Sequence, residues 1–236
     1  MPQRGFVLIE VAIALLVLAL ILGGILAPLN AQVEQGKIRD TNKVISDINE
    51  ALLGYVMING RLPRPATSSI NGVENAAACG SVPGSDPEEV CKGFIPWTTL
   101  GSGKLDAWGN IIRYSVTPAF ANSAFALTTV GTKTIHEGDP ALPLAEKVPV
   151  VVWSNGPQNF GTNGTGAVRA NNSSGVTNKD EIFNNTAVLF FISRVSTNNS
   201  AATNSSGAVG GEFDDIVTFI PTAILVNKAI AAGKLP

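Results

Sequence analysis

Hydrophobic and polar positions divide the chain into three parts with different patterns. Residues 6–29 form one apolar run whose only charged side chain belongs to Glu10. In residues 30–59 apolar and polar positions recur at helical spacing, and from residue 60 onward short apolar runs are separated by polar stretches. These patterns predict an apolar helix, its amphipathic continuation and a β-rich head, in that order.

The first two parts are expected to form one long helix. An apolar run of about 20 residues crosses a bilayer as a helix, so residues 6–29 are predicted to span a membrane once. A secretory signal peptide is the alternative, but the run is too long for its apolar core and a poor cleavage site follows it. The continuation carries an apolar stripe, which is short for the heptads of a free coiled coil. Asn59-Gly60 is expected to end the helix. The stripe consists of Ile38, Ile45, Ile48, Leu52 and Val56.

The head, residues 60–236, is predicted to consist of strands separated by loops. Stretches rich in Asn, Ser, Gly and Thr at 155–178 and 196–211 are expected loops, and a short helix is expected from Thr222 to Ala232. The predicted fold class is α+β, with a long N-terminal helical spine packed on an antiparallel β-sheet head. Segments rich in β-branched or aromatic residues are the candidate strands: 111–116, 125–130, 148–153, 187–193 and 216–220.

Composition narrows the functions open to such a chain. Charged residues make up 14% of the sequence, and 16 basic against 18 acidic side chains give a net charge of −2. A nucleic-acid-binding protein needs a basic face, so we predict no nucleic-acid contact. One histidine, His136, and two cysteines provide little material for a zinc site or a Cys/His nucleophile pair. No phosphate-binding loop or nucleophile elbow stands out either, so the chain is not expected to be an enzyme.

Glu10 is the most informative residue of the apolar run. A carboxylate in the middle of a membrane helix costs about 2.5–3.5 kcal/mol on insertion scales, and less near the interface. Either Glu10 lies at the level of the lipid headgroups, or another group compensates its charge. The residues around it favour the second interpretation.

The sequence RGFVLIE at residues 4–10 resembles the processing site of type IV pilins and type II secretion pseudopilins. In that family a short basic leader ends in glycine, the mature chain usually begins with phenylalanine, and its fifth residue is glutamate. The resemblance implies that residues 1–5 are a prepilin leader, that a prepilin peptidase cuts after Gly5, and that Phe6 becomes N-methylated. It also implies that Glu10 pairs with the Phe6 amine of a neighbouring subunit, which offsets the cost of burying both charges. Val7 departs from the pattern, because many members have threonine there.

The resemblance implies a pilin-like fold and a structural function. The chain is predicted to be a minor pilin or pseudopilin, a subunit of a type IV pilus or type II secretion-type filament. The expected partners are the prepilin peptidase, other pilin or pseudopilin subunits, the inner-membrane assembly platform and membrane lipid. The expected localisation is a single pass through the bacterial inner membrane with the head in the periplasm, followed by the filament. The alternative is a membrane-anchored periplasmic adhesin or ligand-binding domain that never polymerises.

Cys79 and Cys91 lie twelve positions apart in a loop rich in Gly, Pro and Ser. In a periplasmic or extracellular head they are expected to form a disulfide, with two free thiols as the alternative. Closing a loop of that size contributes about 3 kcal/mol in the chain-entropy model.

The sequence KLDAWGN at residues 104–110 resembles the turn before a strand in the major pseudopilin of type II secretion. Asp106 is expected to cap this turn, Gly109 to take a positive φ, and Trp108 to cover the core.

In that same family an aspartate-rich loop after a later strand binds calcium. The matching stretch here, residues 153–159, has amides in place of the carboxylates, and losing carboxylates weakens a calcium site. No cofactor is therefore expected, and calcium is the alternative. Its candidate ligands are Asn155, Asp180, Glu181, Asp214 and Asp215.

Overall fold

The computed structural model of the 236-residue chain describes residues 8–81, 83–138, 142–171 and 177–236; of residues 22–29 it describes the backbone only. The chain divides into two compact units, Met1–Asp40 and Thr41–Pro236. Helix α1 (Leu8–Asn59) contributes to both. The units are described separately below.

In the first unit the side chains of α1 from Leu8 to Ile21 are all exposed. Leu8 exposes 87% of its surface and Leu20 exposes 69%. Leucine, isoleucine, valine and alanine predominate here, and all but the β-branched residues favour the helix. Helix propensity therefore accounts for the local structure of this segment, while its apolar surface has no cover among the described residues.

The transmembrane prediction for this segment is wrong. None of the helices in the described ranges is long and apolar enough to cross a membrane. The predicted fold class, with a transmembrane first half of the spine, and the predicted single pass through the inner membrane are both corrected by this finding. Among the residues whose side chains the structure describes, the apolar segment is Leu8–Ile21, which is shorter than the about 20 residues that cross a bilayer, and after Asn30 the same helix carries charged residues.

In the second unit α1 is amphipathic and ends where the sequence predicts. Four positions of the predicted stripe are buried, while the charged side chains between them are exposed. Gly60 takes a φ of 68° and donates its N–H to the Val56 carbonyl at 2.8 Å, which closes the helix. The buried stripe positions are Ile45, Ile48, Leu52 and Val56.

Within the described residues, the second unit contains two sheets, and the first of them shares a core with this part of the helix. The first sheet has the order β1-β2-β5-β7, and every neighbouring pair is antiparallel. The second has the order β4-β3-β6, in which β3 pairs antiparallel with β4 and parallel with β6. The strands are β1 (Lys92–Phe94), β2 (Arg113–Val116), β3 (Lys133–His136), β4 (Pro143–Val148), β5 (Val150–Ser154), β6 (Phe190–Ile192) and β7 (Ile216–Ile220).

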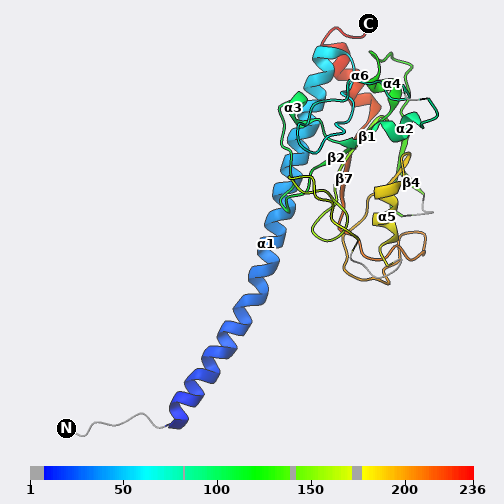
Figure 1. Ribbon diagram of the computed structural model, residues 1–236. Helices are drawn as coiled ribbons and strands as arrows, with labels where there is room; N and C mark the ends of the chain where they lie inside the picture. The colour runs from blue at the N-terminus through cyan, green and yellow to red at the C-terminus, as the bar shows by residue number, and fades with distance from the viewer. Residues whose placement is uncertain (1–7, 82, 139–141, 172–176) are drawn as a thin grey trace. The chain divides into compact units, whose positions relative to one another are not determined.

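Strand β5 lies at the centre of the unit and is buried along its whole length. Because successive side chains of a strand point to opposite faces, β5 serves two cores. Val150 and Val152 belong to the cluster that contains the α1 stripe, whereas Val151 and Trp153 belong to a cluster with Phe191 of the second sheet. The first sheet therefore lies between α1 and the second sheet, as the ribbon also shows (Figure 1).

In the described part of the second unit, five short helices accompany the sheets. Helix α6 lies beside the C-terminal end of α1 (Figure 1), and its buried Leu225 and Ala229 join the same core cluster as the stripe. The predicted C-terminal helix is thus confirmed to within one residue. The short helices are α2 (Pro87–Val90), α3 (Trp97–Leu100), α4 (Pro118–Ala121), α5 (Lys179–Thr186) and α6 (Thr222–Ala231).

The strand predictions are only partly correct. Strand 216–220 is confirmed, and shorter strands lie in or next to three other predicted segments. Segment 125–130 is not a strand: Phe125 packs on Phe120 with ring centroids 4.9 Å apart, and the Thr129 N–H then bonds the Ala126 carbonyl in a turn. Phe125 is apolar because it anchors this turn to the core, and not because it lies on one face of a strand. Strands β1, β3 and β4 were missed, and the parallel β3–β6 pair departs from the predicted antiparallel head.

Candidate functional site

Glu10 lies in the first turn of α1 and is exposed. A carboxylate at this end of a helix interacts favourably with the positive end of the helix dipole. Gly5 and Phe6 lie outside the described residues, so the cleavage site and the methylated terminus stay predictions.

The surface around Glu10 consists of large apolar side chains. They follow one another at spacings of one or two residues, so at about 100° per residue they surround the helix rather than form one stripe. Such a surface can pack against other apolar helices on all sides. The exposed large side chains are Leu8, Ile9, Val11, Ile13, Leu15, Leu16, Val17, Leu18, Leu20 and Ile21.

The predicted disulfide is confirmed. Cys79 and Cys91 are joined, with their Cα atoms 5.5 Å apart, and Cys91 is fully buried in the core cluster. Asn122 fixes the near end of the loop, because its amide accepts from the Cys79 N–H at 2.8 Å and donates to the Cys79 carbonyl at 3.0 Å. The bond therefore ties residues 79–91 to α4 and the core.

The turn at residues 104–110 is capped as predicted. Asp106 Oδ1 accepts from the N–H groups of Trp108 (2.9 Å) and Asn110 (2.8 Å), and Gly109 has a φ of 85°. Asp106 Oδ2 also accepts from the Ser154 hydroxyl at 2.6 Å, which connects the turn to the end of β5. Trp108 is half-buried and belongs to neither core cluster; Trp97 packs there instead.

The acidic calcium candidates are engaged in protein contacts of their own. Asp180 forms an ion pair with Arg194, at 2.6 Å between Oδ2 and Nε. The Glu181 carboxylate accepts from the Asp214 N–H at 2.9 Å, and from two asparagine amides, Asn159 at 3.0 Å and Asn178 at 2.9 Å. Asp180 and Glu181 are neighbours in α5 but serve different networks.

Burial strongly disfavours the charged forms of the remaining two acids. It raises the pKa of Asp215 well above its usual range and that of Asp214 to about 8, with the charge of Glu181 adding to both shifts. Asn155 lies beside Asp215 and lowers its pKa in turn. In the part of the chain that the structure describes, no three His, Cys, Asp or Glu side chains are arranged to hold a metal ion. The absence of a cofactor stays a prediction.

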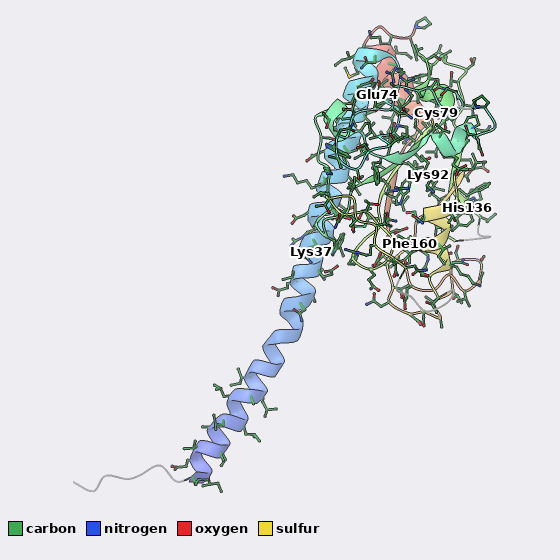
Figure 2. All side chains as sticks on the ribbon, in the orientation of Figure 1. Lys37, Glu74, Cys79, Lys92, His136 and Phe160 are labelled. Carbon is green, nitrogen blue, oxygen red and sulfur yellow. A yellow bond between two sulfur atoms is a disulfide. The ribbon has the colours of Figure 1, made fainter. Side chains whose placement is uncertain are left out.

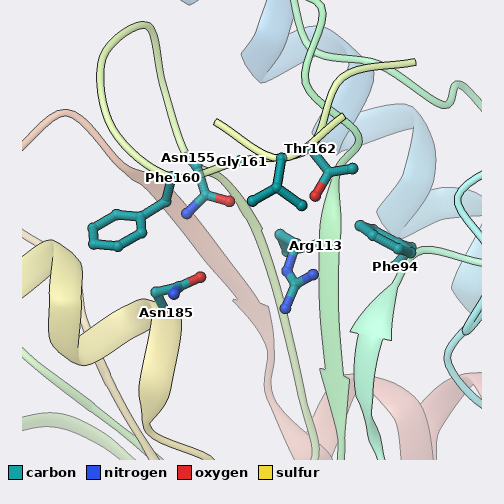
Figure 3. A pocket seen from close by; sticks show the side chains of 8 residues that line it. Phe94, Arg113, Asn155, Phe160, Gly161, Thr162 and Asn185 are labelled. Atoms are coloured by element: carbon teal, nitrogen blue, oxygen red, sulfur yellow. The ribbon is translucent and has the colours of Figure 1, made fainter. Parts of the chain in front are cut away.

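A cavity of about 250 Å³ opens between β2, the end of β5 and α5 (Figure 3). The side chains of Arg113, Asn155 and Asn185 face this space, with Phe160 on one side and Phe94 on the other (Figure 3). Thr162, Gly161 and Val168 complete the lining.

Arg113 is held in the cavity by aromatic rings. Its guanidinium carbon lies 5.0 Å from the centre of the Phe94 ring and 5.6 Å from that of Trp153. Burial lowers the pKa of Arg113 to about 10. No acidic side chain among the described residues forms an ion pair with it, and its Nε atom is buried without a hydrogen-bond partner.

A second basic side chain, half-buried, lies near Arg113. Lys92, labelled in Figure 2, donates through Nζ to the backbone carbonyls of Asn184 (3.0 Å), Asn185 (2.8 Å) and Ala187, at the C-terminal end of α5. Burial, with the charges of Arg113 and Lys133 adding to it, lowers the pKa of Lys92 to about 7. Three bonds to carbonyls favour the ammonium form, and the nearby charges of Asp215 and Glu89 act in the same direction.

Sequence reasoning missed this cavity. Arg113 stands inside the stretch Ile111–Val116, which the sequence predicts to be an ordinary strand. A charged residue within a buried strand is the signal that could have pointed to a site. Asn155 was considered only as a calcium ligand.

Comparisons of the chain with protein-family models, with curated proteins and with solved structures find no match. The resemblance in residues 4–10 therefore stays a prediction about the family.

Proposed function

We propose that this chain is a minor pilin or pseudopilin, a structural subunit of a type IV pilus or type II secretion-type filament. The observation that carries the proposal is the exposed apolar surface of α1 from Leu8 to Ile21. Monomeric soluble proteins rarely leave so large an apolar surface uncovered. In a helical filament the corresponding helices of neighbouring subunits cover it.

The energetics of such an assembly are favourable. Burying one leucine, isoleucine or valine side chain contributes about 1.5–3 kcal/mol, and ten large apolar side chains are exposed in this segment. Apolar packing alone specifies no axial register, because the side chains surround the helix uniformly. A single charge among them does: Glu10 is stable in an apolar bundle only where a positive group meets it.

Processing would supply that positive group. Cutting after Gly5 creates an α-amino group on Phe6, and N-methylation keeps its positive charge. The motif RGFVLIE at residues 4–10 supports this step, which requires a prepilin peptidase as partner. Pairing of Glu10 with the Phe6 amine of a neighbouring subunit then sets the register.

The test is the mature N-terminus, measured by intact-mass and N-terminal peptide mass spectrometry after expression with and without a prepilin peptidase. We expect a chain beginning at N-methylated Phe6 with the enzyme, and an intact Gly5–Phe6 bond without it. A second prepilin in the same cells reports that the enzyme is active. An intact Gly5–Phe6 bond beside a processed second prepilin would overturn the proposal.

A further inference from the structure

The Arg113 cavity contains a positive charge that the fold does not neutralise. A guanidinium has five N–H donors, and removing it from water without a counter-charge is unfavourable. The rings of Phe94 and Trp153 interact with its faces but accept none of its in-plane N–H groups. A buried anion in the cavity would stabilise this cation.

The amide of Asn155 is a second unsatisfied group in the same lining. Asn155 is 1% exposed, and neither its Oδ1 nor its Nδ2 has a hydrogen bond of ordinary geometry. Buried polar groups normally have hydrogen-bond partners, so the Asn155 amide, which lies beside Asp215, and the unpartnered Arg113 Nε indicate that both can contact one ligand. Arg113 comes from β2 and Asn155 from the residue after β5, so two adjacent strands fix the pair.

The lining also restricts the chemistry of the ligand. The fork of a guanidinium matches the two oxygens of a carboxylate, with which it forms paired charge-assisted hydrogen bonds. Phe94, Phe160 and Val168 offer apolar surface beside that fork. A volume of about 250 Å³ admits a small organic molecule rather than an extended chain. One cation with one amide suits a single negative charge.

We propose that the cavity lined by Arg113, Asn155, Phe94 and Phe160 binds an organic monocarboxylate with an apolar body. The carboxylate contacts the Arg113 guanidinium and the Asn155 amide, and the apolar body lies between the two phenylalanine rings. The site lies entirely in the unit Thr41–Pro236 and does not depend on the proposed role of the chain in a filament.

Titration of the full-length chain with benzoate tests the proposal. Calorimetry gives the affinity, and the NMR signal of the Arg113 Nε–H group reports where the ligand lies. We expect saturable binding with a Kd on the order of 1 mM or tighter. Benzamide has the same shape without the charge and should bind at least tenfold more weakly. Equal binding of the two would show an apolar cavity without carboxylate recognition, and tighter binding of inorganic phosphate would overturn the ligand class.

Two variants with matched controls locate the interaction. Arg113→Met should abolish benzoate binding while the chain stays folded, because it removes a charge that has no ion-pair partner among the described residues and keeps an apolar stem of similar length. Arg39→Met, at an exposed arginine of α1, should leave binding unchanged. Retained binding in Arg113→Met would overturn the proposal.

The second variant does not alter the interior. Val168 lines the cavity but is 78% exposed, so Val168→Glu should leave the fold intact and place a negative charge at the opening. We expect it to weaken benzoate binding at least fivefold, whereas Val195→Glu, at a position 84% exposed elsewhere, should not. Equal affinities in the two variants would contradict binding in this cavity, including when Arg113→Met fails to fold.

Discussion

The two parts of helix α1 are both rich in apolar side chains, but only one of them is covered by its own chain. From Leu8 to Ile21 every side chain is exposed, whereas Ile45, Ile48, Leu52 and Val56 are buried in the core of the second unit. The difference follows from spacing rather than from hydrophobicity. Apolar residues on one helix face match one sheet face, while apolar residues on all faces need several partners, which other subunits can supply.

The largest loss of stability is expected from truncating a side chain in the part of α1 that is buried in the second unit. Leu52 is fully buried in the main core cluster, so Leu52→Ala should lower the free energy of unfolding by about 2–5 kcal/mol. The matched change Leu16→Ala, at a residue 62% exposed, should leave it unchanged within about 0.5 kcal/mol. All three tryptophans, Trp97, Trp108 and Trp153, lie in the second unit, so denaturant titration by fluorescence measures this quantity. Equal losses of unfolding free energy in Leu52→Ala and Leu16→Ala would contradict the difference in burial between the two parts of α1.

The disulfide should contribute the next largest effect. Replacing both Cys79 and Cys91 by serine should cost about 3 kcal/mol of unfolding free energy, because the loop then regains its freedom in the unfolded chain. The same loss should appear when the wild type is titrated in a reducing agent, and reduction should not change the double variant further. A double variant as stable as the oxidised wild type would show that the core, not the crosslink, holds residues 79–91.

The free energy of unfolding should depend on pH through the acids packed inside the second unit, and much less through the exposed acids of α1. The Asp214 carboxyl has a pKa of about 8 in the folded chain against 3.8 when exposed, so the folded state binds more protons between these values. Stability is therefore greatest below about pH 4 for this group and falls as the pH rises to 8, by at most about 1.4 kcal/mol per pH unit.

Asp214→Asn should flatten this fall, whereas Asp47→Asn, at an exposed position of α1, should not. Urea titrations of the three proteins at pH 5, 6, 7 and 8 give the comparison. Asp215 and Glu181 interact with Asp214, so some pH dependence will persist in the variant. Parallel curves for wild type and Asp214→Asn would show that Asp214 is ionised in the folded chain.

The smallest expected changes in stability come from two glycines near the C-terminal end of α1, one that ends the helix and one that lies inside it. Gly60 ends the helix with a φ of 68°, so Gly60→Ala should destabilise the second unit by about 1 kcal/mol. Gly54 lies inside the helix, and an added Cβ there would meet nothing within 4 Å. Gly54→Ala should therefore stabilise the unit by about 0.5–1 kcal/mol, and thermal unfolding should show shifts of opposite sign. Shifts of the same sign would contradict the assigned helix end.

The sequence predicted the features that local patterns determine. The stripe, the end at Gly60, the Asp106 turn, the disulfide and the C-terminal helix each depend on residues close together in the chain or on a single pair. The transmembrane prediction counted residues 6–29 as one apolar span, whereas no helix among the described residues is long and apolar enough to cross a membrane.

Features that depend on distant pairings were not predictable in the same way. Strand β5 is buried on both faces because a second sheet covers it, and that sheet depends on a parallel pairing between β3 and β6 across more than fifty residues. The Arg113 cavity likewise unites β1, β2, the end of β5 and α5. Arg113 alone carried a local signal, as a charge inside an apolar strand.

The assembly of the uncovered part of α1 is tested most directly by Glu10→Ala, with Glu50→Ala as the matched control at another exposed glutamate of the same helix. The measurement is the fraction of each protein recovered in sheared filaments, with processing checked by mass spectrometry. We expect both variants to be processed, Glu50→Ala to be incorporated like the wild type, and Glu10→Ala to fall at least tenfold. Incorporation of Glu10→Ala at the wild-type level would contradict the proposal that pairing of Glu10 with the Phe6 amine of a neighbour sets the axial register, and with it the proposed role of this helix.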